Sequence, residues 1–203
     1  MVTSSGNIVM KRIVFAVLLL LITAGDVLGA GVYTVEVLVF ARDDLASTEY
    51  FPPDPGSPDY TGAATLEELG FSEIASSSGT LGPEKYTLAK YGEAEPLYHK
   101  VWRQPMRSRT SPDRIHISTG SDDPLSPPLL EGVLELGAGR FFHIGVDLLL
   151  RGQRLSAAAG VRQIGPSGPG YQFYRMTAQR KMKRNELHFI DHPKMGILVV
   201  IRR

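Results

Sequence analysis

The side chains best suited to chemistry lie close together near the carboxyl end of the chain. They are two histidines and two carboxylates, namely Glu186, His188, Asp191 and His192. On an extended strand Glu186, His188 and His192 share one face, because even spacings repeat on the same side. Such a set could hold a metal ion, but the histidine pair with an intervening glutamate that zinc proteases carry on a helix is absent. The segment from Asp191 to Pro193 is also typical of a turn, so we expect neither a metal site nor a bound cofactor.

Nucleophilic catalysis has little support in the sequence. The chain contains no cysteine and no Gly-x-Ser-x-Gly elbow, and Ser167 lacks the strand-to-helix context that exposes an activated hydroxyl. A carboxylate pair of the kind that cleaves glycosides would require Glu186 or Asp191 to lie opposite Glu131 or Asp147. No spacing supports that pairing specifically. We therefore expect a protein that is not an enzyme, with a metal- or carboxylate-dependent hydrolase as the alternative.

A first candidate binding surface is the aromatic and cationic segment 98–105, which contains the only tryptophan of the chain. Alternation along a strand places Tyr98, Trp102 and Gln104 on one face and Arg103 on the other. Trp102 or Tyr98 could stack on a sugar ring, with Arg103 close to a carboxylate. The alternative is that Trp102 belongs to the core, as most lone tryptophans do. The candidate ligand-binding residues of this segment are Tyr98, Trp102, Arg103 and Gln104.

A second candidate surface is the basic stretch 175–184. Its candidate ligand-binding residues are Arg180, Lys181, Lys183 and Arg184, and the adjacent histidines His188 and His192 are added to them. The formal net charge of the whole chain is only +1, but the last third carries mostly arginine and lysine. Such an asymmetry can focus an anionic partner onto one surface. As alternatives to binding a partner, the basic residues could form a solvent-exposed hairpin tip or pair with acidic residues of the first half of the chain.

Residues 1–30 predict a secretory signal peptide. A basic pair at 11–12 precedes the apolar run 13–22, which is shorter than the roughly 20 apolar residues that cross a bilayer. Small residues favour cleavage near Gly29 or Ala30. We therefore expect an exported protein with its leader removed, which excludes nucleic acid as the partner of the basic stretch.

The absence of cysteine sharpens this expectation. It removes the attachment residue of a lipoprotein, and it also excludes disulfides, so stability must come from a hydrophobic core. The mature chain should carry no membrane anchor after cleavage. Met10 stands directly before the basic pair and is an alternative initiator.

Residues 31–203 should form a single β-rich domain, because roughly 170 residues suffice for one core. Short β-prone runs separated by turn residues predict strands. These strands are expected near 33–40, 95–104, 114–118, 132–136, 140–150, 171–180, 186–190 and 196–202. The fold class is α+β and mostly antiparallel β, as a single twisted sheet or partly open barrel of about six to eight strands with one or two short helices.

Turn and cap signals refine this outline. Pro83 and Gly92 bound a short helix, and Thr65 with Glu68 forms a capping box. A flexible insertion rich in proline and serine is expected at about 43–82. Two connections are short enough for hairpins. They are 137–139 and 183–185, the latter with Asn185 in a left-handed conformation.

Three segments taken together carry a resemblance to a known family. They are YTVEVLVF at 33–40 directly after the leader, LYHKVWRQP at 97–105 and RKMKRNELHFIDHPKMGILV at 180–199. In order and spacing they resemble the CsiV family of proteobacterial periplasmic proteins, described as peptidoglycan-binding and linked to cell-shape integrity. Residues 130–136 and 140–144 are similar to the central hairpin of that family. The Gly/Pro-rich loop 160–170 and the residue at the 185 turn depart from its pattern.

The resemblance implies a function beyond what composition and spacing give. It implies a periplasmic protein that binds peptidoglycan without enzymatic activity. It also implies support of cell-wall assembly by a bifunctional penicillin-binding protein together with its outer-membrane lipoprotein activator. A cell-wall hydrolase and a periplasmic protein-protein adaptor are the alternatives. No catalytic or ligand residue is carried over from the family, so the candidate residues above rest on the sequence alone.

Overall fold

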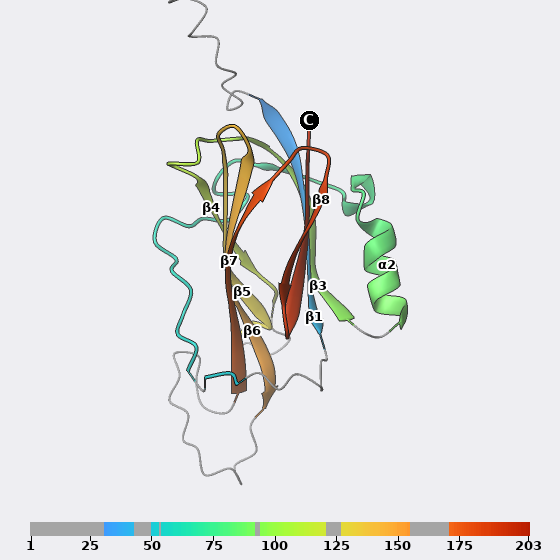
Figure 1. The fold of residues 1–203 in the computed structure, drawn as a ribbon, viewed down its shortest axis with the longest axis vertical. Coiled ribbons are helices and arrows are strands. Elements are labelled where there is room, and N and C mark those ends of the chain that lie inside the picture. Colours follow the sequence, from blue (N-terminus) through green and yellow to red (C-terminus); the bar gives the residue numbers. More distant parts are fainter. Residues whose placement is uncertain (1–30, 43–49, 53, 92–93, 121–126, 155–170) are drawn as a thin grey trace, which may run out of the picture.

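The described residues form two antiparallel sheets that lie face to face (Figure 1). The computed structural model describes residues 31–42, 50–52, 54–91, 94–120, 127–154 and 171–203. The five-stranded sheet has the order β2-β3-β1-β9-β8, and the four-stranded sheet has the order β4-β5-β6-β7. The strands are β1 (Val32–Arg42), β2 (Ser72–Ile74), β3 (Ala94–Pro105), β4 (Asp113–Ser118), β5 (Leu130–Ala138), β6 (Phe142–Arg154), β7 (Tyr171–Met182), β8 (Leu187–His192) and β9 (Met195–Arg202).

The centre of the five-stranded sheet is β1, which pairs with β3 on one side and with β9 on the other. Its β-branched residues Val35, Val37 and Val39 are fully buried and face the second sheet. The alternate residues point to the opposite side of the sheet, and they include Leu38 and the completely buried Glu36. Both faces of β1 are therefore covered, as expected for a strand that is apolar on both sides.

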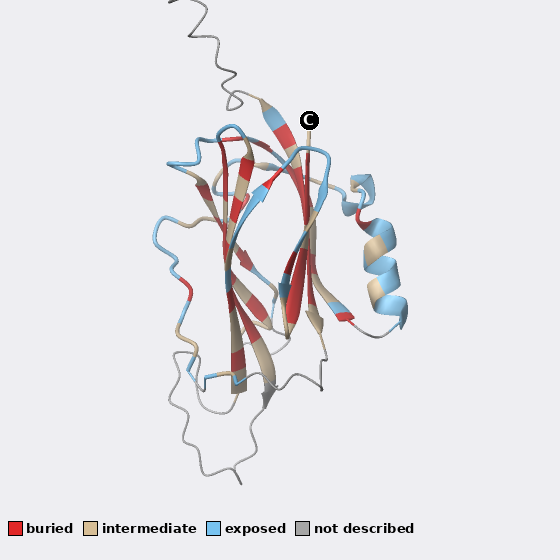
Figure 2. Cartoon of the chain, viewed as in Figure 1, coloured by how far each residue is buried: buried red, intermediate tan, exposed pale blue. Residues whose placement is uncertain are grey.

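The core lies between the two sheets and is visible as the buried bands along the strands in Figure 2. From the four-stranded sheet it receives the even-numbered residues of β5 and β6, such as Leu134, Leu136, Ile144 and Leu148. The odd-numbered residues of these strands therefore point outward, because side chains alternate along a strand. No helix in the described part of the chain is long and apolar enough to cross a membrane.

The outer face of the five-stranded sheet is covered by the helix α2 (Gly82–Tyr91) and the segment before it, which contains the short 3-10 helix η2 (Ser76–Ser78) (Figure 1). Leu81 packs with Leu38 and Val200 in a small second apolar cluster, against which Leu88 and Leu198 lie. The position of α2 agrees with the expected proline-in, glycine-out helix.

The segment before β2 follows the edge and outer face of the four-stranded sheet. Ala64 forms a parallel bridge with Ile115 of β4. The capping box is confirmed, because the Thr65 amide donates to Glu68 Oε2 at 2.8 Å and the Glu68 amide donates to Thr65 Oγ1 at 3.3 Å. It closes a turn, and the chain then enters β2. Within the expected insertion at 43–82, the described part thus carries defined turns, β2 and η2.

The expected fold class is confirmed in its main feature, a mostly antiparallel β architecture with a short helix. The strands divide into two open sheets, whereas one sheet or a partly open barrel was expected. The hairpin expected at 137–139 is confirmed as the β5–β6 connection. The predicted signal peptide and the predicted loop 160–170 lie outside the described residues.

The hairpin expected at 183–185 is wrong, because β7 and β8 belong to different sheets. The connection takes the chain from one layer to the other, with Met182 and Ile190 on either side of it buried in the shared core. Asn185 does adopt the expected left-handed conformation, with a φ of 60°, and its amide donates to the Ile201 carbonyl. The basic stretch therefore lies along the edge strand β7 and at a corner between the layers.

Candidate functional site

A groove runs over the outer face of the four-stranded sheet. It consists of two adjoining pockets of about 310 and 410 Å³ that share Glu135, Gly145 and Gln179. These three residues form one row across β5, β6 and β7 in the strand register. Because Gly145 has no side chain, the row has a gap between the flanking Glu135 and Gln179. A Cβ atom at Gly145 would lie 3.0 Å from Glu135 Oε2, so the gap is narrow and bordered by a carboxylate.

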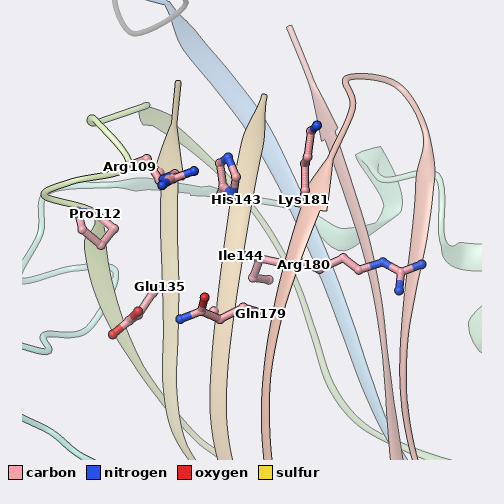
Figure 3. A pocket seen from close by; sticks show the side chains of 10 residues that line it. Arg109, Pro112, Glu135, His143, Ile144, Gln179, Arg180 and Lys181 are labelled. Atoms are coloured by element: carbon pink, nitrogen blue, oxygen red, sulfur yellow. The ribbon is translucent and has the colours of Figure 1, made fainter. Parts of the chain in front are cut away.

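One end of the groove is cationic (Figure 3). Arg109, His143 and Lys181 line this end, and His143 and Lys181 are direct neighbours across β6 and β7. Lys181 Nζ lies 3.7 Å from the centre of the Phe141 ring. Burial, followed by the positive charges of Arg109 and Lys181, lowers the pKa of His143 below its ordinary value of 6.5. The imidazole is therefore held neutral between two cations.

The loop that carries Arg109 is fixed to the end of β5. The Arg109 amide donates to the Ala138 carbonyl at 2.8 Å, and the Ala138 amide donates to the Arg107 carbonyl at 2.8 Å. The loop approaches so closely that a Cβ atom at Gly137 would lie 3.0 Å from Arg109 Cα. A glycine is needed at this position, because any side chain would displace the loop backbone. Arg109 is thus positioned by backbone contacts.

The other end of the groove is electrically balanced. Asp147 accepts two hydrogen bonds from Arg175, at 2.7 and 2.9 Å. Arg114 bridges Glu135 Oε1 and Asp59. The segment containing Asp59 is held on the sheet because its amide donates to Asp147 Oδ2. The three carboxylates at this end are therefore each paired with an arginine.

The cations at the first end are not paired in this way. Within the described residues, neither Arg109 nor Lys181 forms an ion pair with a carboxylate. Both side chains are exposed, so they can attract an anionic group, most strongly at low salt. The cations without a carboxylate partner among the described residues are therefore concentrated at one end of the groove.

Three residues predicted to bind ligand are part of the core. Trp102 and Gln104 are 0% exposed and Tyr98 is 8% exposed. Trp102 Nε1 donates to Gln104 Oε1 at 2.6 Å, and Gln104 Nε2 donates to Asp113 at 3.3 Å. Burial raises the pKa of Asp113, whereas the positive charge of Arg107 acts in the opposite direction. The expected stacking of Trp102 or Tyr98 on a sugar ring is corrected, because no ring face is open to solvent.

Arg103 is exposed, but it points to the outer side of the five-stranded sheet, away from the groove. Lys183 and Arg184 are exposed at the corner between the layers, where Lys183 pairs with Glu186. Of the candidate residues in the basic stretch, Arg180 and Lys181 line the groove. The Arg180 side chain extends away from His143 and Gln179, on the other side of β7 (Figure 3). Lys181 is therefore the one candidate residue whose charged group belongs to the cationic end.

The two histidines of β8 share a face, as expected, but each stabilises a different turn. His188 Nε2 accepts a hydrogen bond from the Lys183 amide at 3.1 Å, and His192 Nδ1 accepts one from the Lys194 amide at 3.1 Å. No group of three or more potential metal ligands occurs among the residues that the structure describes. These contacts give both histidines structural roles.

The carboxylate pairs considered for hydrolysis are not brought together. Asp191 pairs with Arg42 on the five-stranded sheet, and Glu186 lies at the corner with Lys183. Asp147, on the four-stranded sheet, is bound by Arg175. The arrangement that a two-carboxylate mechanism would require is absent at these positions.

Sequence reasoning missed most of the groove. Arg109, Glu135, His143 and Gln179 come from a loop and three strands, and no local motif joins them. One signal was available in β6, where the outward positions His143, Gly145 and Asp147 interrupt an otherwise apolar strand. A polar face that contains a glycine indicates an open sheet surface more specifically than a run of basic residues does.

Comparison with known proteins assigns the chain to a family. The sequence model described as "Peptidoglycan-binding protein, CsiV" matches residues 13–203, nearly the whole chain. No curated protein and no solved structure matches the chain significantly. The match includes every element that forms the groove, from the segment at 54–62 to β7. The chain therefore belongs to the CsiV family of peptidoglycan-binding proteins.

Proposed function

We propose that this protein binds peptidoglycan through the groove on the four-stranded sheet, in the periplasm and without catalysing a reaction. The observation that carries the proposal is the pocket-lining row at Gly145 on the same outer face as Arg109 and Lys181, which have no carboxylate partner among the described residues. The family description supplies the polymer. The groove supplies two adjoining pockets on an outer face for contact with it.

The chemistry of the groove suits this polymer. Peptidoglycan combines neutral sugars with stem peptides that bear amides and carboxylates. Gln179 and neutral His143 can donate and accept hydrogen bonds, and the two cations can pair with a carboxylate. A hydrogen bond to a charged group contributes about 1.5–3 kcal/mol, so a few such contacts give specific binding.

A binding role agrees better with the groove than hydrolysis does. General acid-base catalysis needs a carboxyl group free to exchange a proton near neutral pH. Asp147 and Glu135 are instead bound by Arg175 and Arg114, so neither carboxylate is free to act on a substrate. The groove offers fixed charges and hydrogen-bonding groups, which are the properties of a binding surface.

The proposal is tested by sedimentation with purified sacculi at low salt. Wild-type protein should pellet with the sacculi, and Gly145→Leu should bind about tenfold more weakly, a loss of about 1.4 kcal/mol, because the new side chain fills the row between Glu135 and Gln179. Gly139→Leu is the matched control, since a side chain there meets no atom within 4 Å and lies outside the groove. If wild-type protein stays in the supernatant, the proposed function fails.

The role of the protein in cell-wall assembly is also a proposal. We propose that the wall-bound protein assists a bifunctional penicillin-binding protein and its lipoprotein activator, as the family resemblance implies. The support is the separation of the groove from the exposed helix α2, which leaves a second surface for a protein partner. A pull-down from wall-free periplasmic and membrane extracts should recover the synthase or its activator. Recovery of neither would contradict this part of the proposal.

A further inference from the structure

We infer that the cationic end of the groove recognises a carboxylate of the peptidoglycan stem peptide, so that the peptide is the element bound and the glycan is not. This inference rests on the proposed function and specifies its ligand. Arg109 and Lys181 stand on either side of His143 and line the same pocket. Two cations around one neutral hydrogen-bonding ring form a site that fits a single carboxylate.

The lack of aromatic side chains in the groove argues against a sugar site. Protein surfaces that bind sugar rings commonly offer a flat aromatic face for stacking. Neither pocket is lined by phenylalanine, tyrosine or tryptophan. The nearby Phe141 ring is already occupied by Lys181 Nζ, 3.7 Å from its centre. A neutral sugar would therefore gain little at the cationic end.

The neighbouring row provides the complementary contacts for a peptide. Glu135 Oε1 is bound by Arg114, while its Oε2 borders the space above Gly145. Oε2 can accept a hydrogen bond from an amide or amine, and Gln179 on the opposite side can both donate and accept. A peptide lying in the groove would thus place N–H donors near Glu135 and its carboxylate near Arg109 and Lys181.

The experiment compares soluble muropeptides by calorimetry. The probes are a disaccharide-tetrapeptide with free carboxylates, the same compound with its carboxylates converted to carboxamides, and the disaccharide alone with its lactyl carboxyl group capped as a carboxamide. The free acid should bind at least about tenfold more tightly than the carboxamide, as expected for a charge-assisted contact. The disaccharide alone should not bind measurably.

Variants that each remove one positive charge test which side chains cause the preference for the free acid. Arg109→Gln and Lys181→Gln should each abolish the preference for the free acid. Arg184→Gln removes the same charge from an exposed position outside the groove and should keep the preference. Thermal unfolding checks that each variant is folded.

Two failures are distinguishable. If wild-type protein pellets with sacculi but binds the carboxamide as tightly as the free acid, the carboxylate inference is overturned and wall binding stands. If Arg184→Gln loses the preference as fully as Arg109→Gln does, the attraction is general and the inference is likewise overturned. If nothing pellets or binds, the proposed function itself fails.

Discussion

The two outer faces of this protein both carry charged clusters, but they use them differently. On the five-stranded sheet, Glu36 is completely buried beneath the segment that leads into α2. Its carboxylate accepts hydrogen bonds from the Thr80 amide at 2.6 Å and the Leu81 amide at 2.9 Å. His99 and Arg202 complete its surroundings at 3.0 and 3.4 Å. On the four-stranded sheet, Arg109 and Lys181 at the cationic end of the groove are exposed and have no carboxylate partner among the described residues.

The difference shows how the same residue types serve structure or binding. A buried carboxylate must be satisfied internally, so its partners fix the chain that covers it. The fit over Glu36 is so close that a Cβ atom at Gly79 would lie 2.0 Å from Glu36 Oε1. In the groove, the Glu135 side chain lies beside Gly145, but no chain segment covers the row, and Glu135, Gly145 and Gln179 line the two pockets. The first face is therefore closed by its charges, and the second is open to a ligand.

The largest expected effect concerns the closed face. Glu36→Gln should lower the free energy of unfolding by about 3 kcal/mol, because it leaves buried cationic and N–H groups without their carboxylate. Glu73→Gln is the control, since Glu73 pairs with Lys100 at the surface and should cost less than about 1 kcal/mol. Chemical denaturation measures both. Equal losses of unfolding free energy in the two variants would contradict the distinction between buried Glu36 and surface Glu73.

The pH dependence of the free energy of unfolding tests the role of Glu36 on the closed face. Burial acts to raise the pKa of Glu36, but the hydrogen bonds from Thr80, His99 and Leu81 outweigh it, so the pKa is lowered from 4.5. A lowered carboxyl pKa contributes stability above the unfolded-state value, and this contribution is lost as the pH falls through the folded-state pKa. The stability difference between wild type and Glu36→Gln should therefore shrink below about pH 4.5. A difference that stays constant down to pH 2 would contradict this role.

A smaller effect is expected in the groove. Burial, followed by the positive charges of Arg109 and Lys181, holds the pKa of His143 below 6.5. A bound carboxylate should raise that pKa, because it offsets the two positive charges. Arg109→Gln should also raise it in the free protein, because one of the two cations is removed. An NMR titration of the His143 ring with and without muropeptide measures both shifts. An unchanged titration in the saturated protein would place the carboxylate elsewhere.

Much of the fold was predictable because the strands carry strong local signals. The β-branched residues of β1, and the alternation that separates Trp102 from Arg103 on β3, gave the correct elements and faces. Alternation alone does not tell which face of a strand meets the core. Trp102 was therefore assigned to a ligand, although the second sheet covers it completely.

The groove could not be predicted because its residues meet only through topology. Arg109 lines the same pocket as Lys181 because a loop is fixed to β5 and because β5, β6 and β7 pair in one register. The hairpin predicted at 183–185 was wrong for a related reason. A short turn can join two paired strands in a hairpin, but it can equally join strands of two different layers. Local sequence fixes the conformation of Asn185 and does not fix which sheet the chain enters next.

Photocrosslinking to sacculi tests most directly which face meets the wall. The photoreactive residue p-benzoylphenylalanine is placed at Gln179 in the groove or at Arg103, an exposed position on the outer side of the five-stranded sheet. After irradiation, peptidoglycan should become attached to the protein labelled at 179, and free muropeptide should compete. Attachment from position 103 with none from position 179 would contradict the assignment of the groove as the peptidoglycan-binding surface.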